Sequence, residues 1–95
     1  MIGVYAIICL NNRKLYVGQS TNIKRRFRNH KYLLRQNKHE NQFLQRAWNK
    51  YGEKMFIFVI LETTSKKKVL EREGWWINEL KAYLGKNGFN KNKFK

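Results

Sequence analysis

The sequence contains no aspartate and no proline, and it has a single cysteine among 95 residues. Cys9 has no second cysteine with which to form an internal disulfide, and this favours a reducing compartment. A charged signal-peptide start and an apolar run of transmembrane length are both missing. Neither a Gly/Ser-rich linker nor an internal repeat divides the chain. We therefore expect one domain spanning 1–95 that is intracellular, not secreted and without a membrane partner.

Positive charge is what the sequence has in excess. Lysine and arginine number 21 against six glutamates, which gives a formal net charge of +15 at pH 7. Such a surface attracts polyanions, and the aromatic content of 15% makes nucleic acid a better match than a membrane. Small ribosomal and RNA-binding proteins share this composition. The charge therefore predicts nucleic-acid binding but says nothing about catalysis.

The hydropathy pattern predicts a ββααβα order of elements. Residues 3–10 and 14–18 are rich in β-branched and aromatic side chains, and the turn pair Asn11-Asn12 between them predicts a β-hairpin. The apolar run 55–61 predicts a buried central or third strand. Three helices are expected, at about 22–36, at about 41–51 with Gly52 as C-terminal cap, and at about 66–84. The fold class is then α+β, with a three-stranded, at least partly antiparallel sheet flanked by three helices.

Arg26 has an unusual place in the first predicted helix. The apolar stripe of this helix comprises Ile23, Phe27, His30 and Leu34. Arg26 lies on the flank of the stripe, one turn before His30, where a desolvated guanidinium needs an anionic partner. The structural alternative is an arginine that snorkels above a core histidine. The remaining cations of the helix fan across its surface and can reach water or phosphate: Lys24, Arg25, Arg28, Lys31 and Arg35.

Glu73 is the anomaly of the third predicted helix. It falls in the middle of an apolar face made of Val69, Leu70, Trp76, Ile77, Leu80 and Leu84. A carboxylate there is strongly destabilising unless it meets a cation, a metal or several donors. Two interpretations are open, a buried pair with Arg26 or a metal ligand in a cleft. Since the other glutamates do not face inward, a two-metal site is disfavoured, and one hard cation such as Mg²⁺ fits better than zinc.

Two tripeptides on the predicted hairpin resemble a known family. Gly3-Val4-Tyr5 and Tyr16-Val17-Gly18, with ten residues between them, resemble the name-giving motifs of the GIY-YIG nuclease superfamily, with valine for isoleucine in each. Further along, Arg26 stands in the place of the family's helix arginine and Glu73 in that of its metal-binding glutamate. Other positions of the resemblance are His30, His39, the stretch NKYGEKMF and the late asparagine Asn90. The similarity extends from Gly3 to Asn90 and is greatest to phage and intron homing endonucleases.

The resemblance implies a metal-dependent DNA endonuclease that hydrolyses phosphodiester bonds one strand at a time. In this interpretation Glu73 holds one Mg²⁺ or Mn²⁺ ion, and Arg26 stabilises charge on the phosphate. Tyr5 is the candidate for activating water, with Tyr16 hydrogen-bonded nearby or sharing the role. Which tyrosine acts is open, because a phenol is a weak base at neutral pH. Apart from the resemblance, each tyrosine also fits a strand aromatic that packs on the sheet.

The resemblance also implies roles for the surrounding residues. His30 is expected to hydrogen-bond a tyrosine hydroxyl or to accept a proton. His39 is expected either to assist the phosphate or to cap the next helix. Lys14 is expected either to approach the DNA backbone or to be a solvated charge at the strand edge. The five cations of the first helix are expected to contact the backbone, which holds DNA without reading its bases. The residues expected to support the site are Gly3, Gly18, His39 and Asn90.

Two other functions fit the composition. A catalytically silent DNA- or RNA-binding module of the same fold would bind nucleic acid without cleaving it. A basic structural protein of a ribonucleoprotein is the third possibility, and it leaves Glu73 unexplained. The expected partner of the nuclease is double-stranded DNA in the cytoplasm or nucleoid of a bacterial or phage-infected cell. No segment after Asn90 is long enough for a DNA-recognition domain, so we expect either a catalytic domain of a longer enzyme or a stand-alone nuclease.

Overall fold

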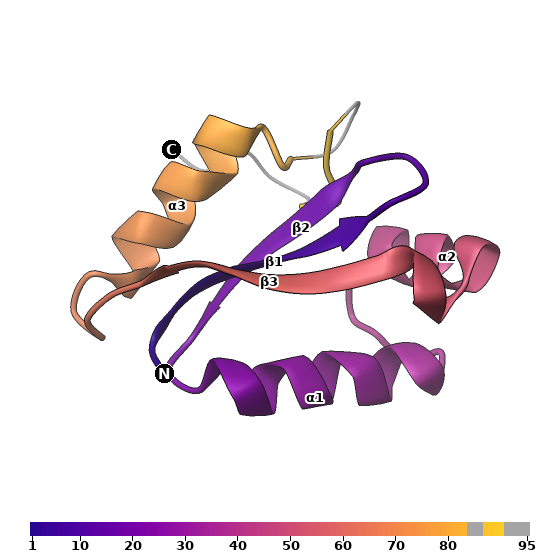
Figure 1. Ribbon diagram of the computed structural model, residues 1–95, viewed down its shortest axis with the longest axis horizontal. Coiled ribbons are helices and arrows are strands. Elements are labelled where there is room, and N and C mark those ends of the chain that lie inside the picture. Colours follow the sequence, from indigo (N-terminus) through magenta and orange to yellow (C-terminus); the bar gives the residue numbers. More distant parts are fainter. Residues whose placement is uncertain (84–86, 91–95) are drawn as a thin grey trace.

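The computed structural model describes residues 1–83 and 87–90 and confirms the ββααβα order. The strands are β1 (Gly3–Cys9), β2 (Leu15–Ser20) and β3 (Phe56–Thr63), and the helices are α1 (Ile23–Arg35), α2 (Gln42–Tyr51) and α3 (Val69–Leu80). A short 3-10 helix, η1 (Glu53–Met55), precedes β3. The sheet is antiparallel throughout, in the order β2-β1-β3. Figure 1 shows α1 and α2 on one side of the sheet and α3 on the other.

Alternation along β1 divides the interior into two apolar clusters. Tyr5, Ile7 and Cys9 point toward α1 and α2, where they join the larger cluster with Ile23, Leu34, Leu44, Trp48 and Phe89. Val4 faces the other way and packs with Val17, Val69, Ile77 and Ala82 beneath α3. Successive strand residues point to opposite faces, so a central strand can supply both clusters only if both faces are apolar. The run GVYAIIC meets that condition.

The hairpin turn lies where the asparagine pair predicts it. Arg13 donates its backbone N–H to the Cys9 carbonyl at 2.8 Å, and the Asn12 side chain accepts the Lys14 N–H at 2.9 Å. The left-handed backbone position falls on Arg13, with φ of 63°, rather than on either asparagine. The turn therefore does not use the Asn pair in the way that a two-residue hairpin loop does.

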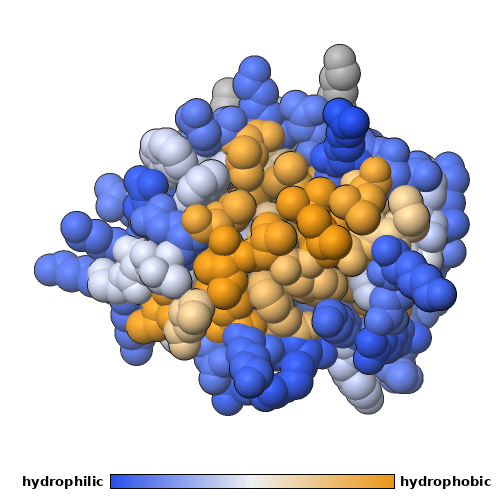
Figure 2. Space-filling view, in the orientation of Figure 1, coloured by the Kyte–Doolittle hydropathy of each residue, from blue (hydrophilic) through white to orange (hydrophobic). Residues whose placement is uncertain are grey.

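The prediction of a buried strand at 55–61 was wrong in one respect. β3 is an edge strand, and Ile57 and Ile60 keep 40% and 44% of their surface exposed. The space-filling view in Figure 2 shows an apolar area in the middle of this face, over β3. The apolar run identified a strand correctly, but hydrophobicity alone does not report which elements cover it. Here α3 packs mainly on β2 and β1.

The first two helices lie close to their predicted bounds. Asn22 caps α1 by accepting the Arg25 N–H at 3.1 Å, and Asn41 caps α2 by accepting the N–H groups of Phe43 and Leu44. Gly52 ends α2 with φ of 88°, as predicted. The predicted apolar stripe of α1 is also confirmed. Its members Ile23, His30 and Leu34 are buried and Phe27 is half-buried.

The third helix is shorter than predicted at both ends. It begins at Val69 rather than at 66, because three consecutive lysines precede it and cations are unfavourable at a helix N-terminus. It ends at Leu80, where Lys81 takes a left-handed conformation with φ of 53° that the sequence did not indicate. Leu70, expected on the apolar face, is 60% exposed in the first turn. Leu84, the last residue expected on that face, lies outside the described residues.

The segment 87–90 runs beside β2. The Leu15 N–H donates to the Asn87 carbonyl at 3.1 Å, and the Phe89 N–H donates to the Leu15 carbonyl at 2.9 Å. Gly88 is required because a Cβ atom there would collide with the Ala82 carbonyl. Phe89 is buried in the larger cluster and anchors this segment to the core. Among the described residues, no helix combines the length and the apolar character needed to span a bilayer.

Candidate active site

The two tripeptides bring a pair of tyrosines onto the α1 side of the hairpin. Tyr5 pairs with Gly18 across the β1–β2 ladder, and Ile7 pairs with Tyr16. Tyr5 is buried and Tyr16 is half-buried. The Tyr5 ring occupies the space that a side chain at Gly18 would need. The glycine of the second motif is therefore a steric consequence of the tyrosine in the first.

Gly3, the other glycine of the motifs, has its own steric reason. A Cβ atom at Gly3 would collide with the backbone carbonyl of Glu62 in β3. Gly3 pairs with Ser20 on one side and with Thr63 on the other, so it lies where all three strands approach. Both supporting glycines predicted from the motifs thus permit close packing around the hairpin, and neither contributes chemistry itself.

A chain of hydrogen bonds runs inward from Tyr5. The Tyr5 hydroxyl lies 2.6 Å from Nε2 of His30, and Nδ1 of His30 lies 2.8 Å from Nε2 of His39. Nδ1 of His39 accepts the backbone N–H of Asn41 at 3.0 Å. The two imidazoles are stacked, with ring centres 5.0 Å apart and planes inclined by 17°. The expected hydrogen bond from His30 to a tyrosine is present, and its partner is Tyr5.

Both histidines are neutral in this environment. Burial lowers the pKa of His30 to about 3, and the nearby charge of Arg26 adds to the effect. Burial also lowers the pKa of His39. The capping role expected for His39 was wrong, since Asn41 caps α2, and the His39 side chain is instead buried against His30. Neither helical periodicity nor a short sequence motif shows whether a loop residue such as His39 points into the interior.

Arg26 faces the hydroxyl of Tyr5 and does not pair with Glu73. Its guanidinium is close enough to Tyr5 to lower the pKa of the phenol, and Nη2 lies 3.5 Å from Oε1 of Glu40. The Glu40 side chain is 75% exposed, and such a pair contributes little stability. Of the two interpretations left open by the sequence, a buried Arg26–Glu73 pair is wrong. The guanidinium remains available to an anionic ligand.

Glu73 is a half-buried carboxylate that has no partner in the part of the chain that the structure describes. Val69, Glu73 and Ile77 follow one another at four-residue steps, so Glu73 lies on the stripe that packs on the sheet. Burial raises its pKa, and no described residue gives it a hydrogen bond or an ion pair. Burial is the main cause that raises the pKa of Tyr5 and of Tyr16, and the negative charge of Glu73 adds a smaller effect in the same direction. An uncompensated carboxylate beside two hydroxyls is suited to a cation.

The donor set fits one hard cation and not a larger metal centre. Within residues 1–83 and 87–90, no group of three or more His, Cys, Asp or Glu side chains could hold a metal. An ion at Glu73 would take its remaining ligands from water and from a substrate phosphate, as Mg²⁺ commonly does. Its charge would offset the effect of Glu73 on both tyrosines.

The two phenols are protonated in the domain alone. Burial is the main cause that raises the pKa of Tyr5 and that of Tyr16, while Arg26 lowers both. No hydrogen bond joins their hydroxyl groups, although the rings of His30 and His39 contact the Tyr16 ring edge to face. The expected hydrogen bond between the tyrosines is therefore absent from the described structure.

Asn90 clamps β2 next to Tyr16. Its Oδ1 accepts the Val17 N–H at 2.8 Å, and its Nδ2 donates to the Val17 carbonyl at 2.9 Å. The neighbouring Phe89 carbonyl accepts a hydrogen bond from Nδ2 of Asn41 at 3.0 Å. Sequence reasoning missed Asn41, although its place before an amphipathic helix marks it as an N-cap. Asn41 joins the histidine chain to the segment that supports the tyrosines.

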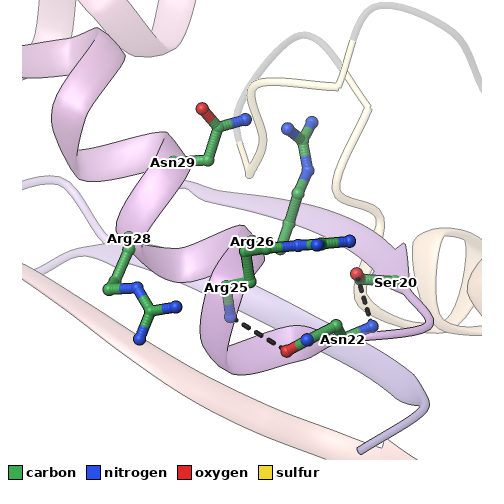
Figure 3. A pocket seen from close by; sticks show the side chains of 6 residues that line it. All are labelled: Ser20, Asn22, Arg25, Arg26, Arg28 and Asn29. Atoms are coloured by element: carbon green, nitrogen blue, oxygen red, sulfur yellow. Dashed lines mark hydrogen bonds between the residues drawn. The ribbon is translucent and has the colours of Figure 1, made fainter.

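A basic pocket of about 520 Å³ opens beside Arg26. It is lined by Ser20, Asn22, Arg25, Arg26, Arg28 and Asn29, which come from the end of β2 and the first two turns of α1 (Figure 3). Three guanidinium groups around one hollow favour the binding of phosphate.

The other predicted DNA contacts are not equivalent to the pocket arginines. The Lys31 ammonium lies 5.0 Å from the Phe58 ring centre, and Arg35 makes two hydrogen bonds to Glu53. Lys24 borders a separate, apolar hollow. Lys14 lies half-buried near the hairpin turn. The arginines that line the basic pocket are therefore better placed to bind phosphate than the other predicted cations, which have different neighbours.

The fold and the site define a nuclease-type catalytic domain. The model of the GIY-YIG catalytic domain matches residues 1–90, so the chain belongs to this family. Among proteins of known function, it is similar to intron-associated endonuclease 1 of Enterobacteria phage T4, with 37% identity over 90 residues. The match covers 93% of this chain and 36% of that protein, so the chain spans about a third of the length of this relative.

Two solved structures share the fold. The catalytic domain of the homing endonuclease I-TevI has a TM-score of 0.87 and 34% identity, covering 97% of this chain and 99% of that one. A mutant of the same catalytic domain, in which one glutamate is replaced by alanine, has a TM-score of 0.85 and 33% identity, covering 99% and 96%. The predicted fold class and family are confirmed.

Proposed function

We propose that this domain is a metal-dependent DNA endonuclease that hydrolyses one phosphodiester strand at a time. The observation that carries the proposal is Glu73, a half-buried carboxylate that has no partner among residues 1–83 and 87–90 and whose charge acts on Tyr5 and Tyr16. A structural protein gains nothing from such a group, because its burial is unfavourable. The names of the similar proteins, which are endonucleases, support the same reaction class.

Substrate binding is assigned to Arg26 and the adjoining pocket. The planar guanidinium of Arg26 can donate two parallel hydrogen bonds to a phosphate, and Glu40, its ion-pair partner among the described residues, is weakly held. Arg25 and Arg28 would hold neighbouring phosphates of the same strand. As negative charge builds on the phosphoryl oxygens, Arg26 would stabilise it.

Tyr5 is proposed as the group that accepts a proton from the attacking water, and it would do so as the phenolate, after its own phenolic proton has passed to bulk water. Its oxygen already has two neighbours that stabilise negative charge, Arg26 and the hydrogen-bonded His30. Tyr16 has no hydrogen bond to a described residue through its hydroxyl and would help to position the water. Glu73 would hold one Mg²⁺ or Mn²⁺ ion, which supplies Lewis-acid stabilisation of the phosphate and the leaving group when bound.

Double-stranded DNA is the proposed substrate, and a separate DNA-recognition region is the proposed source of sequence preference. The basic pocket can bind backbone phosphates but offers no element for a DNA groove. The relative from phage T4 is nearly three times as long as the matched region, which leaves room there for such a region. The cytoplasm or nucleoid of a bacterial or phage-infected cell is the proposed location.

Incubation of the domain with supercoiled plasmid, with Mg²⁺ or with EDTA, tests the function. We expect open-circle product with Mg²⁺ and none with EDTA. Glu73→Ala should abolish nicking and retain DNA affinity, and Glu79→Ala is the matched control, since Glu79 is exposed on the same helix. Salt-dependent DNA binding without nicking at any metal concentration would instead establish the silent binding module.

A further inference from the structure

We propose that the backbone N–H of Asn41 sets the direction of the histidine chain, so that His30 donates a hydrogen bond to the Tyr5 oxygen and does not receive the Tyr5 proton. Asn41 is thereby a positioning residue for the reaction. The inference rests on the proposed function only in giving Tyr5 a catalytic role. The direction of the hydrogen bonds follows from the structure of the domain itself.

His39 is the first ring of the chain, next to the Asn41 backbone. A backbone N–H can only donate, so Nδ1 of His39, 3.0 Å from the Asn41 nitrogen, must be an unprotonated acceptor. Burial lowers the pKa of His39, which keeps the imidazole neutral. A neutral imidazole carries one N–H, and that hydrogen must then be on Nε2.

The same reasoning fixes His30. Nε2–H of His39 faces Nδ1 of His30 at 2.8 Å, so this Nδ1 accepts. Burial lowers the pKa of His30 to about 3, and the ring is neutral at physiological pH. Its hydrogen is therefore on Nε2, which donates to the Tyr5 oxygen at 2.6 Å. Every bond of the chain points from Asn41 toward Tyr5.

The consequence for Tyr5 is that its oxygen accepts a hydrogen bond from His30, so the phenolic hydrogen is turned away from that ring. When the hydrogen leaves, the His30 N–H and the nearby positive charge of Arg26 both stabilise the phenolate that remains. His30 lacks a free lone pair on Nε2, and it cannot act as the acceptor without reversing the whole chain.

Asn41 is held firmly enough to have this effect. Its Oδ1 caps α2 through the N–H groups of Phe43 and Leu44, each at 3.0 Å, and its Nδ2 donates to the Phe89 carbonyl. Gln45, one turn later, accepts the His39 N–H at 3.0 Å and donates to the Leu34 carbonyl. The peptide between His39 and α2 is therefore fixed from both sides.

Nitrogen-15 NMR of the two histidines tests the direction without any cleavage assay. At about pH 7 we expect both rings as the neutral Nε2–H form, with unprotonated Nδ1. A neutral Nδ1–H form or an imidazolium at either ring would overturn the proposal. The result is independent of nicking, so failure of the inference and failure of the proposed function are distinguishable.

A pair of Asn41 variants tests the effect on the reaction. Asn41→Pro and Asn41→Ala both lose the side-chain hydrogen bonds, but only the proline variant loses the N–H. The backbone φ of −89° at Asn41 is near the range of proline. We expect kcat of Asn41→Pro to lie about tenfold below that of Asn41→Ala, at similar DNA affinity. The acidic limb of the pH profile of kcat for Asn41→Pro should shift to higher pH. The reason is that Tyr5 loses a hydrogen-bond donor, so the pKa of Tyr5 rises.

Equal kcat values and pH profiles in folded Asn41→Pro and Asn41→Ala would contradict the proposal. A second pair covers the case in which the proline variant does not fold. His39→Gln keeps an N–H that can donate to Nδ1 of His30, whereas His39→Leu does not, and both leave the Asn41 N–H without its acceptor. The glutamine variant should retain the higher kcat, and equal rates in this pair would overturn the inference.

Discussion

Two clusters of polar side chains around α3 differ in how far the protein satisfies them. In the first, Glu62 accepts hydrogen bonds from Arg72 at 2.9 and 3.0 Å and from the Trp76 indole at 2.9 Å. These hydrogen bonds lower the pKa of Glu62, with that to Arg72 the larger cause. In the second, Glu73 has no partner among the described residues, and burial raises its pKa.

The contrast between Glu62, which is paired, and Glu73, which is unpaired among the described residues, distinguishes a cluster that stabilises the fold from one that is open to a ligand. Glu62 and Arg72 join β3 to α3, and the Arg72 guanidinium also stacks 4.6 Å from the Trp75 ring centre. A change in that cluster acts on the stability of the fold. The active site contains groups whose burial lowers the stability of the folded protein. Such groups are common in sites where a bound ligand supplies the missing partner. The predictions below test this contrast.

The largest effect is expected from the two arginines. Arg26→Lys should reduce nicking by about two to three orders of magnitude, since an ammonium cannot replace a planar donor pair on the phosphate. Arg72→Lys should leave the nicking rate within about threefold, because Arg72 is occupied by Glu62. Single-turnover nicking rates check both variants, and equal loss in the two would remove the distinction.

The second prediction concerns acid. His30 has a folded pKa of about 3 against an ordinary value of 6.5, so the unfolded chain binds the extra proton between these values. The stability from this group is complete above about pH 6.5 and is lost as the pH falls toward about 3. The expected slope is up to about 1.4 kcal/mol per pH unit. Urea midpoints measured from neutral to acidic pH check it, and His30→Gln should flatten the curve.

The third prediction compares the two glutamates in thermal melts. Glu73→Gln should raise Tm by about 2–5 °C at neutral pH, because it removes a buried charge. The gain should shrink as the pH falls toward 4.5, since the raised pKa of Glu73 makes the folded state bind its proton first. Glu62→Gln should lower Tm, and its effect should vanish below the depressed pKa of Glu62. A lower Tm for Glu73→Gln would mean that Glu73 has a partner.

The smallest effect is expected at the surface. Replacing Arg25 and Arg28 together by glutamine should weaken DNA binding and reduce the slope of log Kd against log salt by about two. The matched control Arg35→Gln removes a cation that Glu53 already holds, and it should change the slope by less than about one. Fluorescence anisotropy with a short duplex measures both, and identical slopes would show that the pocket is not the DNA contact.

Local patterns were enough to find the principal residues of the candidate site. Helical periodicity singled out Arg26 on the flank of one stripe and Glu73 within another, and the structure keeps both placements. The glycine motifs marked the positions where β1, β2 and β3 approach closely. Such signals are local because they depend on spacing within one element or on the absence of a Cβ atom.

The sequence did not predict which side chains contact one another when they lie on different elements. Helical periodicity could not show that Leu70 is exposed in the first turn of α3, because it does not tell how far the sheet beneath the helix extends. Nor could it pair Arg26 with Glu40, or Glu62 with Arg72, since each pair joins separate elements. His39 was misassigned for the same reason, because its partner His30 lies on another element.

The sequence by itself determined the family, the order of elements and the residue types that the chemistry requires, because these depend on composition and on spacing along the chain. Only the tertiary structure decided which of those groups are paired and which are free. It left Glu73 without a partner among the residues that the structure describes, and it aligned Asn41, His39 and His30 behind Tyr5. The physical reason is that hydrogen-bond direction and desolvation are set by neighbours distant in sequence.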